Sequence, residues 1–490
     1  MSGPRGALLS GPASQPLLVA AATAGTAASI LVFAALIATG ERTIVADIGP
    51  AGPFADLHHM VPIGLVRVGC WFATVAGGAG VLAGLAAVRR GWRPRPGLVL
   101  AACGVATVLF VLVPPAASVD VQNYAEYGRM VVLGHNPYVM TPEDLYRLGD
   151  PVGLLRPGPW QGQPTVYGPL ATAVEAAAAW LGGASMAWIT FWIKVLNGVC
   201  YIAVALVLGR LAGPDPARRA RVAVLWTVNP LMLFWMVAGA HADLLAVLPL
   251  LVALWALRAT WRWRSQVRSG WAAALAGALS GAAIAVKVTF AAPVAGLAVA
   301  LWRRYPQGRR ELLLASGAGG GLLVLAVGYL VVGGHALSSL TQRLSSKGDA
   351  FLPLPPAVFN HAAFYSTVTL AAVLLVGVLL AWRLPAGFGE LPEVRPVLVC
   401  ALAVVLGGIV QYPWYDAMFF PLLALFPASS LDTWLVGRIT LISCVILPAV
   451  PIRGDQYRAV RILVPAFMIA FLVALAAGKL RAAKPLPAAG

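Results

Sequence analysis

The residues most able to carry chemistry in this sequence are acidic, histidine and lysine side chains at the ends of long apolar runs. Asp120 directly follows the apolar run 97–117, and the segment it begins also holds Tyr124 and Arg129. A carboxylate there could act as a general base that takes a proton from a hydroxyl group. It could equally cap a helix, because Asp is a preferred N-cap residue. The residues alone leave both interpretations open.

Two further polar segments follow at short distance along the chain. The run Gly134-His-Asn-Pro-Tyr138 places Asn136 and Tyr138 in what is first of all a turn signal. Tyr167-Gly-Pro leads into the apolar stretch 168–182 and could be a hinge with an aromatic anchor at a membrane interface. In either segment the polar groups could instead bind a substrate.

Later in the chain, two polar segments each lie between apolar runs. Gly239-Ala-His241-Ala-Asp243 could be a tight turn in water, or its two titratable groups could bind a polar head group. Gln411-Tyr-Pro-Trp414-Tyr-Asp could be an aromatic anchor at the interface or one wall of a binding site.

Basic residues also occur inside or at the edges of apolar runs. Lys287 could extend along the helix to reach the membrane surface. Lys194 lies deeper in its apolar run, so we expect it to need an anionic partner. Arg67 lies a few residues into its run.

Motifs typical of metal and nucleotide sites are absent from the sequence. It contains no DxD, HExxH, Walker or GxSxG motif, and no His/Cys spacing typical of a metal site. The five cysteines all lie in apolar stretches, where they are expected to pack as small hydrophobic residues. We therefore expect neither a metal nor another cofactor.

Composition sets the class of protein that must position these residues. The chain has 490 residues, of which 60% are hydrophobic and 11% charged, with a formal charge of +17. Soluble domains have about 45–50% apolar and about 25% charged residues. Together with a mean hydropathy of +0.82, this excludes an ordinary soluble enzyme, a disordered chain and a nucleic-acid-binding protein. The sequence predicts an all-α, polytopic membrane protein that forms one integral membrane domain over residues 1–490.

The apolar runs predict about 13–14 transmembrane helices, since one span needs about 20 apolar residues. The first run is too long for the core of a signal peptide and should remain as a spanning helix. The predicted spans are 17–39, 63–88, 97–117, 186–211, 222–240, 243–258, 270–287, 288–302, 311–332, 363–383, 395–411, 416–431, 432–450 and 461–480.

Basic residues orient these spans. Lys- and Arg-rich loops stay in the cytoplasm, which places both termini there and directs the loops 118–167 and 333–362 outward. The apolar stretch 168–182 is short, and counting it as a span would move the cluster Arg218–Arg221 to the outer side. We therefore predict an interfacial or re-entrant outer helix over 168–182, with Pro169 in its first turn.

The polar segments occur in a specific order. D-x-x-x-Y-x-x-x-G begins at Asp120, and G-x-N-P-Y, Y-G-P, N-P-L, G-x-H-x-D, A-V-K and P-W-Y follow, the last ending at Tyr415. Over roughly residues 40–430 this order resembles the polyprenol-phosphomannose-dependent α-(1→6)-mannopyranosyltransferases of actinobacteria. These are class C glycosyltransferases that elongate lipomannan and lipoarabinomannan. The sequence departs from that pattern at Gln122-Asn123 and at Ala242, where relatives carry Asn.

The resemblance implies a fold, a reaction and a site. It implies a plasma-membrane enzyme whose site faces outward and which transfers mannose from polyprenyl-phosphate mannose to a glycan or glycolipid, with inversion at the anomeric carbon. Asp120 stands at the position of the family's catalytic base. The implied donor- and acceptor-binding residues are Tyr124, Arg129, Asn136, Tyr138, Tyr167, Lys194, His241, Asp243, Lys287 and Trp414.

Three alternatives remain open at this point. The donor could be another lipid-phosphate sugar, such as an arabinosyl donor. The protein could instead move a lipid-linked sugar across the bilayer, although a transporter would be expected to have polar groups near mid-membrane and an inverted repeat. It could also be a scaffold without activity, against which the presence of Asp120, Tyr124 and Lys287 argues.

Overall fold

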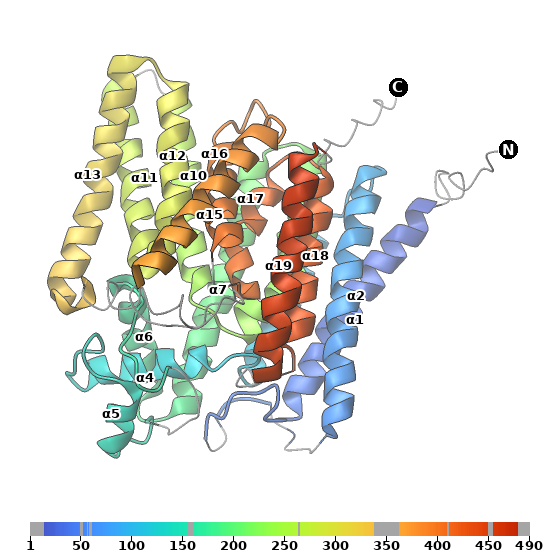
Figure 1. Ribbon diagram of the computed structural model, residues 1–490, viewed down its shortest axis with the longest axis vertical. Coiled ribbons are helices and arrows are strands. Elements are labelled where there is room, and N and C mark those ends of the chain that lie inside the picture. Colours follow the sequence, from blue (N-terminus) through green and yellow to red (C-terminus); the bar gives the residue numbers. More distant parts are fainter. Residues whose placement is uncertain are drawn as a thin grey trace.

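The computed structural model is built almost entirely from helices (Figure 1). It describes residues 14–49, 52–55, 57, 61–153, 160–262, 265–337, 362–408, 411–448 and 454–478. Across these ranges the chain forms no β-strand, and an isolated bridge joins Val45 to Ala116. The all-α prediction is confirmed.

The long apolar runs form long helices. Within the described ranges, five helices are long and apolar enough to cross a membrane, or six if one bent pair counts as a single span. The five are α1 (Ser14–Ala38), α2 (Ile63–Arg89), α7 (Met186–Ala212), α11 (Gln266–Val286) and α13 (Gln307–Val332). Shorter or partly apolar helices pack beside them: α3 (Pro96–Leu112), α10 (Asp243–Arg262), α12 (Ala291–Arg304), α15 (Ala362–Arg383), α16 (Val394–Gly407), α18 (Ser430–Ile446) and α19 (Gly454–Ala476). Over their described residues, all but three of the predicted spans coincide with one helix. One exception is 288–302, which begins as a 3-10 helix (Val288–Phe290) and continues as α12.

The predicted span 222–240 is not one continuous helix. It forms a chain of short pieces with a bend of 41° between Pro216–Thr227 and Pro230–Ala238. Pro230 lacks an N–H, and the Asn229 side chain accepts hydrogen bonds from the N–H groups of Leu231 and Met232, so a new helix begins there. The pieces are α8 (Pro216–Val222), a π-helix (Ala223–Thr227), α9 (Pro230–Leu233) and a second π-helix (Phe234–Ala238).

The predicted span 416–431 is also broken. A 3-10 helix (Pro413–Met418) is followed by the short α17 (Phe420–Ala424), and both are largely buried in the core. Prolines at the start of each piece favour a new helix start over continuation of the previous one. These short buried segments carry polar side chains into the interior of the bundle.

Three short helices cover one end of the bundle, at the bottom of Figure 1. They are α4 (Asp120–Val132), α5 (Pro142–Arg147) and α6 (Pro169–Gly182). Pro169 occupies the first turn of α6, as predicted. Helices α4 and α6 lie so close together that a Cβ added at Gly128 would be 2.1 Å from the carbonyl oxygen of Glu175. Only a glycine fits at this position. That α6 lies at a membrane surface remains a prediction.

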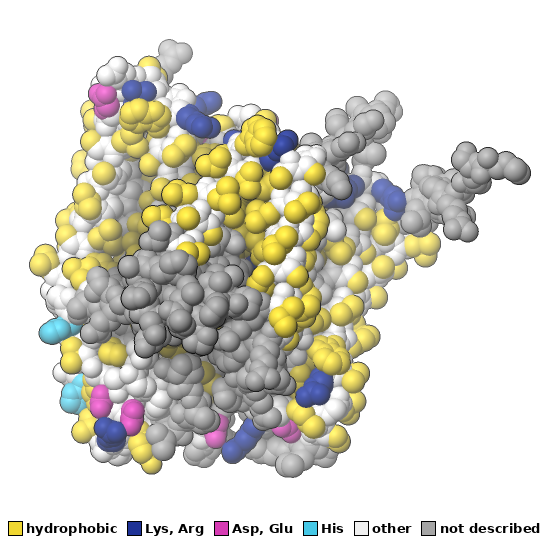
Figure 2. Space-filling model, in the orientation of Figure 1, with side chains coloured by type: hydrophobic (Ala, Val, Ile, Leu, Met, Phe, Trp, Pro, Cys, Tyr) yellow, Lys and Arg dark blue, Asp and Glu magenta, His cyan; other side chains and the backbone are white. Residues whose placement is uncertain are grey.

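The two ends of the molecule differ in charge. Figure 2 shows Lys and Arg side chains at the end that holds the α12–α13 connection, the start of α1 and the end of α19, where the described part of the chain begins and ends. The opposite end, which carries α4, shows acidic and histidine side chains beside a few basic ones. Most of the predicted outer loop 333–362 lies outside the described residues.

Candidate active site

Asp120 is the first residue of α4 and does not cap it. The N-cap position is Val119, and the Asp120 N–H donates to the Ser118 hydroxyl at 3.0 Å. Within the described part of the chain no hydrogen bond to the Asp120 carboxylate is formed, and its side chain is 17% exposed. The structure thus excludes the helix-cap interpretation and leaves the carboxylate available for chemistry.

The backbone before Asp120 is held from several sides. The Ala116 N–H donates to Ala238 O at 3.0 Å, and the Ala117 N–H donates to Ile44 O at 2.7 Å. Ala117 has a φ of 69°, which turns the chain sharply before α4. These contacts fix the carboxylate relative to the broken segment that ends at Ala238.

His241 lies beside Asp120 and is fully buried. Its Nδ1 is 3.6 Å from Asp120 Oδ2. Neither imidazole nitrogen has a hydrogen-bond partner among the described residues. The ring stacks on Trp414 at a centroid distance of 4.0 Å and an interplanar angle of 10°. Unpaired buried nitrogens are costly, and such groups concentrate where a ligand or a proton is handled.

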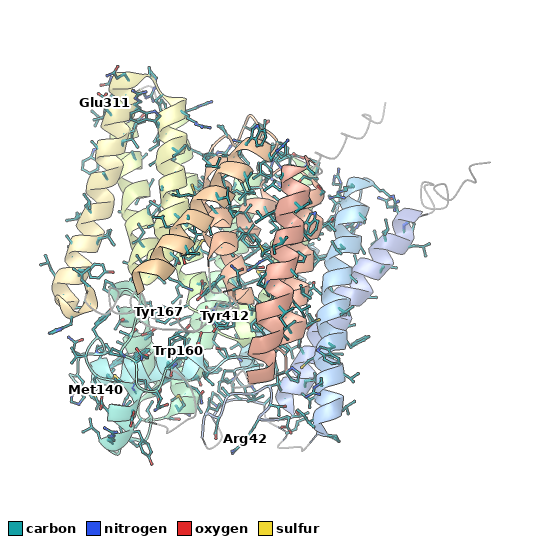
Figure 3. The ribbon with its side chains drawn as sticks, viewed as in Figure 1. Arg42, Met140, Trp160, Tyr167, Glu311 and Tyr412 are labelled. Carbon is teal, nitrogen blue, oxygen red and sulfur yellow. The ribbon has the colours of Figure 1, made fainter. Side chains whose placement is uncertain are left out.

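Trp414 belongs to a larger aromatic wall. Tyr412 stacks on it at 4.3 Å, and Trp235 packs beside it at 5.5 Å. Figure 3 labels Tyr412 and Tyr167 at the boundary between the bundle and the α4–α6 cap. Tyr412 and Trp414 come from a segment far along the chain from Trp235 and His241, so tertiary packing brings this part of the wall to the site.

Lys287 forms a buried ion pair with Asp243. Its Nζ donates to both carboxylate oxygens, at 2.7 and 2.8 Å, and lies 4.1 Å from the centroid of the Tyr415 ring. The Lys287 and Asp243 side chains are 13% and 1% exposed. Lys287 follows the last residue of α11 and Asp243 begins α10, so the pair joins two helix ends. This pairing replaces the predicted extension of Lys287 to the surface.

Tyr124 and Tyr167 face each other across the site. Their hydroxyls are 3.0 Å apart and their rings meet edge to face at 5.1 Å. Burial raises the pKa of both hydroxyls well above the usual range, and the negative charge of Asp120 raises both pKa values further. Both side chains therefore stay neutral and keep a proton that they can donate.

Gly168 explains how Tyr167 reaches α11. Its N–H donates to Val286 O at 3.0 Å, directly before Lys287. A Cβ at this position would lie 2.1 Å from the Ala285 carbonyl oxygen, so only glycine allows this approach.

The structure thus gathers eight residues into one candidate site: Asp120, Tyr124, Tyr167, His241, Asp243, Lys287, Trp414 and Tyr415. Seven of them are predicted from the sequence. Tyr415 was not singled out, although its place next to Trp414 in the P-W-Y motif was a usable signal.

Arg129 makes its contacts with the protein itself. Its guanidinium pairs with Asp150 at 2.9 Å and lies 3.4 Å from Gly183 O. These bonds tie the last turn of α4 to the following loop and to the end of α6. An ion pair that is largely buried on both sides favours a structural role here.

Asn136 and Tyr138 also have partners within the outer cap. The Asn136 side-chain oxygen accepts a hydrogen bond from the Tyr138 N–H at 2.9 Å. This is the hydrogen bond of an Asx turn, as expected if the segment forms a turn. The Tyr138 hydroxyl lies 3.0 Å from the Thr172 hydroxyl on α6, and burial raises the Tyr138 pKa. Their predicted contact with a substrate remains a prediction.

Lys194 differs from its prediction. Its buried ammonium group donates to the carbonyl oxygens of Val113 and Pro114, the latter at 3.1 Å. It also lies 5.3 Å from the centroid of the Phe54 ring. Backbone carbonyl groups thus take the place of the expected anionic partner. They belong to the segment that connects α3 to Asp120 at the start of α4.

Sequence reasoning missed a second buried charge, Arg438. It is 1% exposed, and its guanidinium donates to Asp416 and to the Gln411 side-chain oxygen. An arginine inside the apolar run 432–450 was the signal that could have identified it. The network fixes both ends of the segment that carries Trp414 and Tyr415.

No cluster of metal-binding residues is found in the described part of the chain. The five cysteines are all free. His58, His59 and His361, the last in the predicted outer loop 333–362, lie outside the described residues.

Two curated proteins are similar in sequence to parts of this chain. A probable α-(1→6)-mannopyranosyltransferase of Mycolicibacterium smegmatis is 32% identical over 144 residues, covering 28% of this chain and 25% of that protein. The α-(1→6)-mannopyranosyltransferase B of Corynebacterium glutamicum is 26% identical over 340 residues, covering 62% of this chain and 55% of that protein. The matches thus span about half or less of the length of these relatives.

No solved structure matches the chain. The family model for the N-terminal domain of α-(1→6)-mannopyranosyltransferases matches residues 22–304, a range that contains every candidate-site residue except Trp414 and Tyr415. With that match, the protein belongs to the α-(1→6)-mannopyranosyltransferase family.

Proposed function

We propose that the protein is a membrane glycosyltransferase that moves mannose from polyprenyl-phosphate mannose to a glycan or glycolipid acceptor. Membership of the family and the names of its relatives support the mannosyl transfer. The observation that carries the mechanism is the free Asp120 carboxylate beside His241, within a largely buried polar cluster.

Asp120 acts in this proposal as the general base. Its carboxylate takes the proton of an acceptor hydroxyl, the hydroxyl oxygen bonds to the anomeric carbon, and the bond from that carbon to the phosphate oxygen breaks. This single displacement inverts the anomeric configuration, so a β-linked donor gives an α-linked product. His241, at 3.6 Å, would orient the carboxylate.

The departing phosphate needs positive charge and hydrogen-bond donors. Lys287 supplies a cation, and the neutral Tyr124 and Tyr167 hydroxyls supply donors. The aromatic wall of Tyr412, Trp414 and Trp235 would keep water away from the reacting carbon. Since these groups can stabilise the phosphate, the proposal includes no metal and no other cofactor.

The proposed location is the plasma membrane, with both termini in the cytoplasm and the site on the outer side. The support is the gathering of Lys and Arg side chains at the end of the molecule that holds the termini. The candidate site lies toward the opposite end, beneath the α4–α6 cap, where an acceptor could enter from outside while the lipid tail of the donor stays in the bilayer.

The test compares the wild type with Asp120→Asn in lipid, using radiolabelled polyprenyl-phosphate mannose, a short α-mannoside acceptor and EDTA. Asp120→Asn should lower the rate of transfer about 10²–10⁴-fold, the contribution typical of a general base. The matched control is Asp47→Asn, an aspartate whose side chain is 52% exposed and which should transfer at the wild-type rate.

Wild-type turnover by Asp120→Asn would refute its role as base. Transfer only from another polyprenyl-phosphate sugar, such as an arabinosyl donor, would keep the mechanism and replace mannose. Translocation of the lipid-linked sugar without transfer would move the protein to the transporter class.

A further inference from the structure

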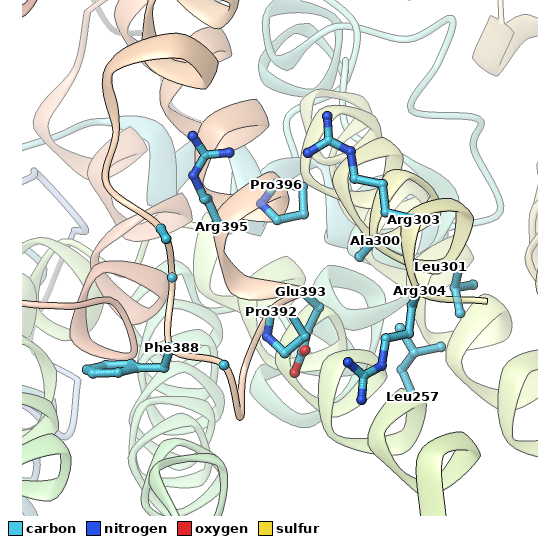
Figure 4. A pocket seen from close by; sticks show the side chains of 13 residues that line it. Leu257, Ala300, Leu301, Arg303, Arg304, Phe388, Pro392, Glu393, Arg395 and Pro396 are labelled. Atoms are coloured by element: carbon cyan, nitrogen blue, oxygen red, sulfur yellow. The ribbon is translucent and has the colours of Figure 1, made fainter. Parts of the chain in front are cut away.

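A cavity lined by apolar and basic residues lies far from the candidate active site, at the end that holds the α12–α13 connection. It has a volume of about 470 Å³ and lies between the C-terminal end of α12, the α15–α16 connection and the first turn of α16 (Figure 4). The side chains that carry the argument are Arg303, Arg304, Glu393 and Arg395. Phe388 and Pro392 add apolar surface, so the lining combines positive charge with hydrophobic contacts.

The charges in this cavity favour an anion. Arg303 and Arg304 are exposed at the end of α12. Arg395 donates to Pro385 O at 3.0 Å and Ala381 O at 2.7 Å, which holds its charge at the cavity. The cavity also includes the N-terminal end of α16, where the helix dipole favours negative charge.

Glu393 is a buried polar group without a partner in this cavity. It is 1% exposed, and neither carboxylate oxygen has a hydrogen-bond partner on another described residue. Burial raises its pKa to about 7, although its own backbone N–H and the nearby Arg258 and Arg304 act to lower it. In its protonated form the side chain can donate a hydrogen bond to an anion in the cavity.

Exposed tryptophans place this cavity at the level of lipid head groups. Trp255 on α10, Trp302 on α12 and Trp382 on α15 are 51%, 54% and 68% exposed. Each lies within the last turns of its helix, near the residues that line the cavity. Exposed Trp rings gather at the membrane–water interface, and basic cavities between helices on the cytoplasmic side attract anionic lipids.

We infer that this cavity binds the phosphate head group of an anionic lipid from the leaflet on the side of the chain termini. The arginines would hold the phosphate, the dipole of α16 would favour its charge, and the apolar lining would contact the glycerol region. This site is separate from the candidate active site, so binding can be measured whether or not the protein transfers a sugar.

The experiment measures lipid binding to the full-length protein by native mass spectrometry, with phosphatidylglycerol and phosphatidylcholine as probes. A second arm adds inorganic phosphate alone. Arg303→Gln should weaken phosphatidylglycerol binding about fivefold, the effect expected for one arginine near a charged lipid. The matched control is Arg268→Gln, which removes one exposed arginine from the same end of the molecule but outside the cavity.

Three results would overturn the inference. Equal losses in Arg303→Gln and Arg268→Gln would show only general attraction to the surface. Equal binding of phosphatidylglycerol and phosphatidylcholine would show that the phosphate charge is not recognised. Competition by inorganic phosphate at low concentration, without a preference for the lipid, would assign the cavity to a free anion.

Glu393→Gln gives an independent arm based on pH. Arg258 from α10, Arg303 and Arg304 from α12, and Arg395 from α16 stay charged between pH 6 and 8, so Glu393 is the group that titrates there. Wild-type binding should weaken as the pH rises through about 7, because the ionised carboxylate repels the phosphate. Glu393→Gln should bind equally at both pH values, and the same pH dependence in wild type and variant would contradict the role of Glu393.

Discussion

Two buried polar clusters meet at the segment 411–416, and they differ in how their charges are satisfied. On one side, Arg438 donates to Asp416 and Gln411. On the other, His241 stacks on Trp414 with both nitrogens unpaired. Buried polar groups are normally hydrogen-bonded, so the contacts of Arg438 are what folding requires, although Asp416 Oδ2 and Arg438 Nε have no partner among the described residues. The unpaired cluster needs a substrate or a proton to account for it.

The largest expected effect tests the paired cluster. Arg438→Met removes the cation but leaves Asp416 and Gln411 buried without their partner. Breaking a buried pair in this way costs about 3–5 kcal/mol. Thermal unfolding in detergent should therefore begin at a clearly lower temperature, and the yield of folded protein should fall.

Arg89→Met is the matched control. Arg89 is 40% exposed and contacts Asp432, which remains paired with Arg221 at 2.7 Å. Its loss should cost less than about 1 kcal/mol. Equal effects of the two substitutions would contradict a structural role specific to Arg438.

The next effect tests the unpaired cluster. His241→Phe keeps an aromatic ring against Trp414 but removes both nitrogens. Because no hydrogen bond is lost within the protein, stability should be unchanged or higher. The transfer rate should fall about 10–100-fold if the imidazole orients or supports the base.

Rate and stability measured together separate this role from a packing effect. A histidine that assists Asp120 should lower kcat when it is replaced, while the melting temperature stays the same or rises. A lower rate that accompanies reduced stability would show that the ring serves packing only.

The smallest effect concerns Glu175 on α6, a third buried group without partners. It is 3% exposed, both oxygens lack a hydrogen-bond partner among the described residues, and burial raises its pKa well above the usual range. The folded protein holds the proton, whereas the unfolded chain loses it above about pH 4.3. Stability should therefore fall as the pH rises from that value toward the folded-state pKa.

Glu175→Gln should remove this dependence. The variant should melt at the wild-type temperature at pH 5 and about 1–3 °C higher at pH 8. Glu143→Gln, at a side chain that is 39% exposed, should behave as the wild type at both pH values. A wild-type melting temperature that rises between pH 5 and 8, with no difference for Glu175→Gln, would contradict a neutral Glu175.

The sequence predicted the helices best where hydrophobic length decides the outcome. Runs such as 63–88 and 186–211 became single helices because about 20 apolar residues leave the backbone few other ways to satisfy its hydrogen bonds. The run 222–240 broke instead, since one Asn side chain and one Pro restart the helix at Asn229. The hydrophobicity of the whole run does not reveal a single capping residue, so the break was not predicted.

The site was predictable as a set of residue types but not as a geometry. The motifs contain all eight residues of the candidate site, and seven of them are among the site residues that the resemblance implies. The motif order gave no means to separate them from Arg129 and Lys194, whose partners are Asp150 and two backbone carbonyls. Those partners are distant in the chain, and only tertiary packing brings them within bonding distance.

The backbone contact at Gly168 has a consequence for tolerance to mutation. A scan of all substitutions would mark Gly168 as intolerant as Asp120, because any Cβ would meet the Ala285 carbonyl oxygen at 2.1 Å. Gly128 would behave in the same way against Glu175. A position in this protein can therefore be intolerant to substitution for either of two reasons. Either its side chain takes part in the reaction, or its backbone lies too close to another backbone to leave room for a side chain. Only a separate measure of folding would tell them apart.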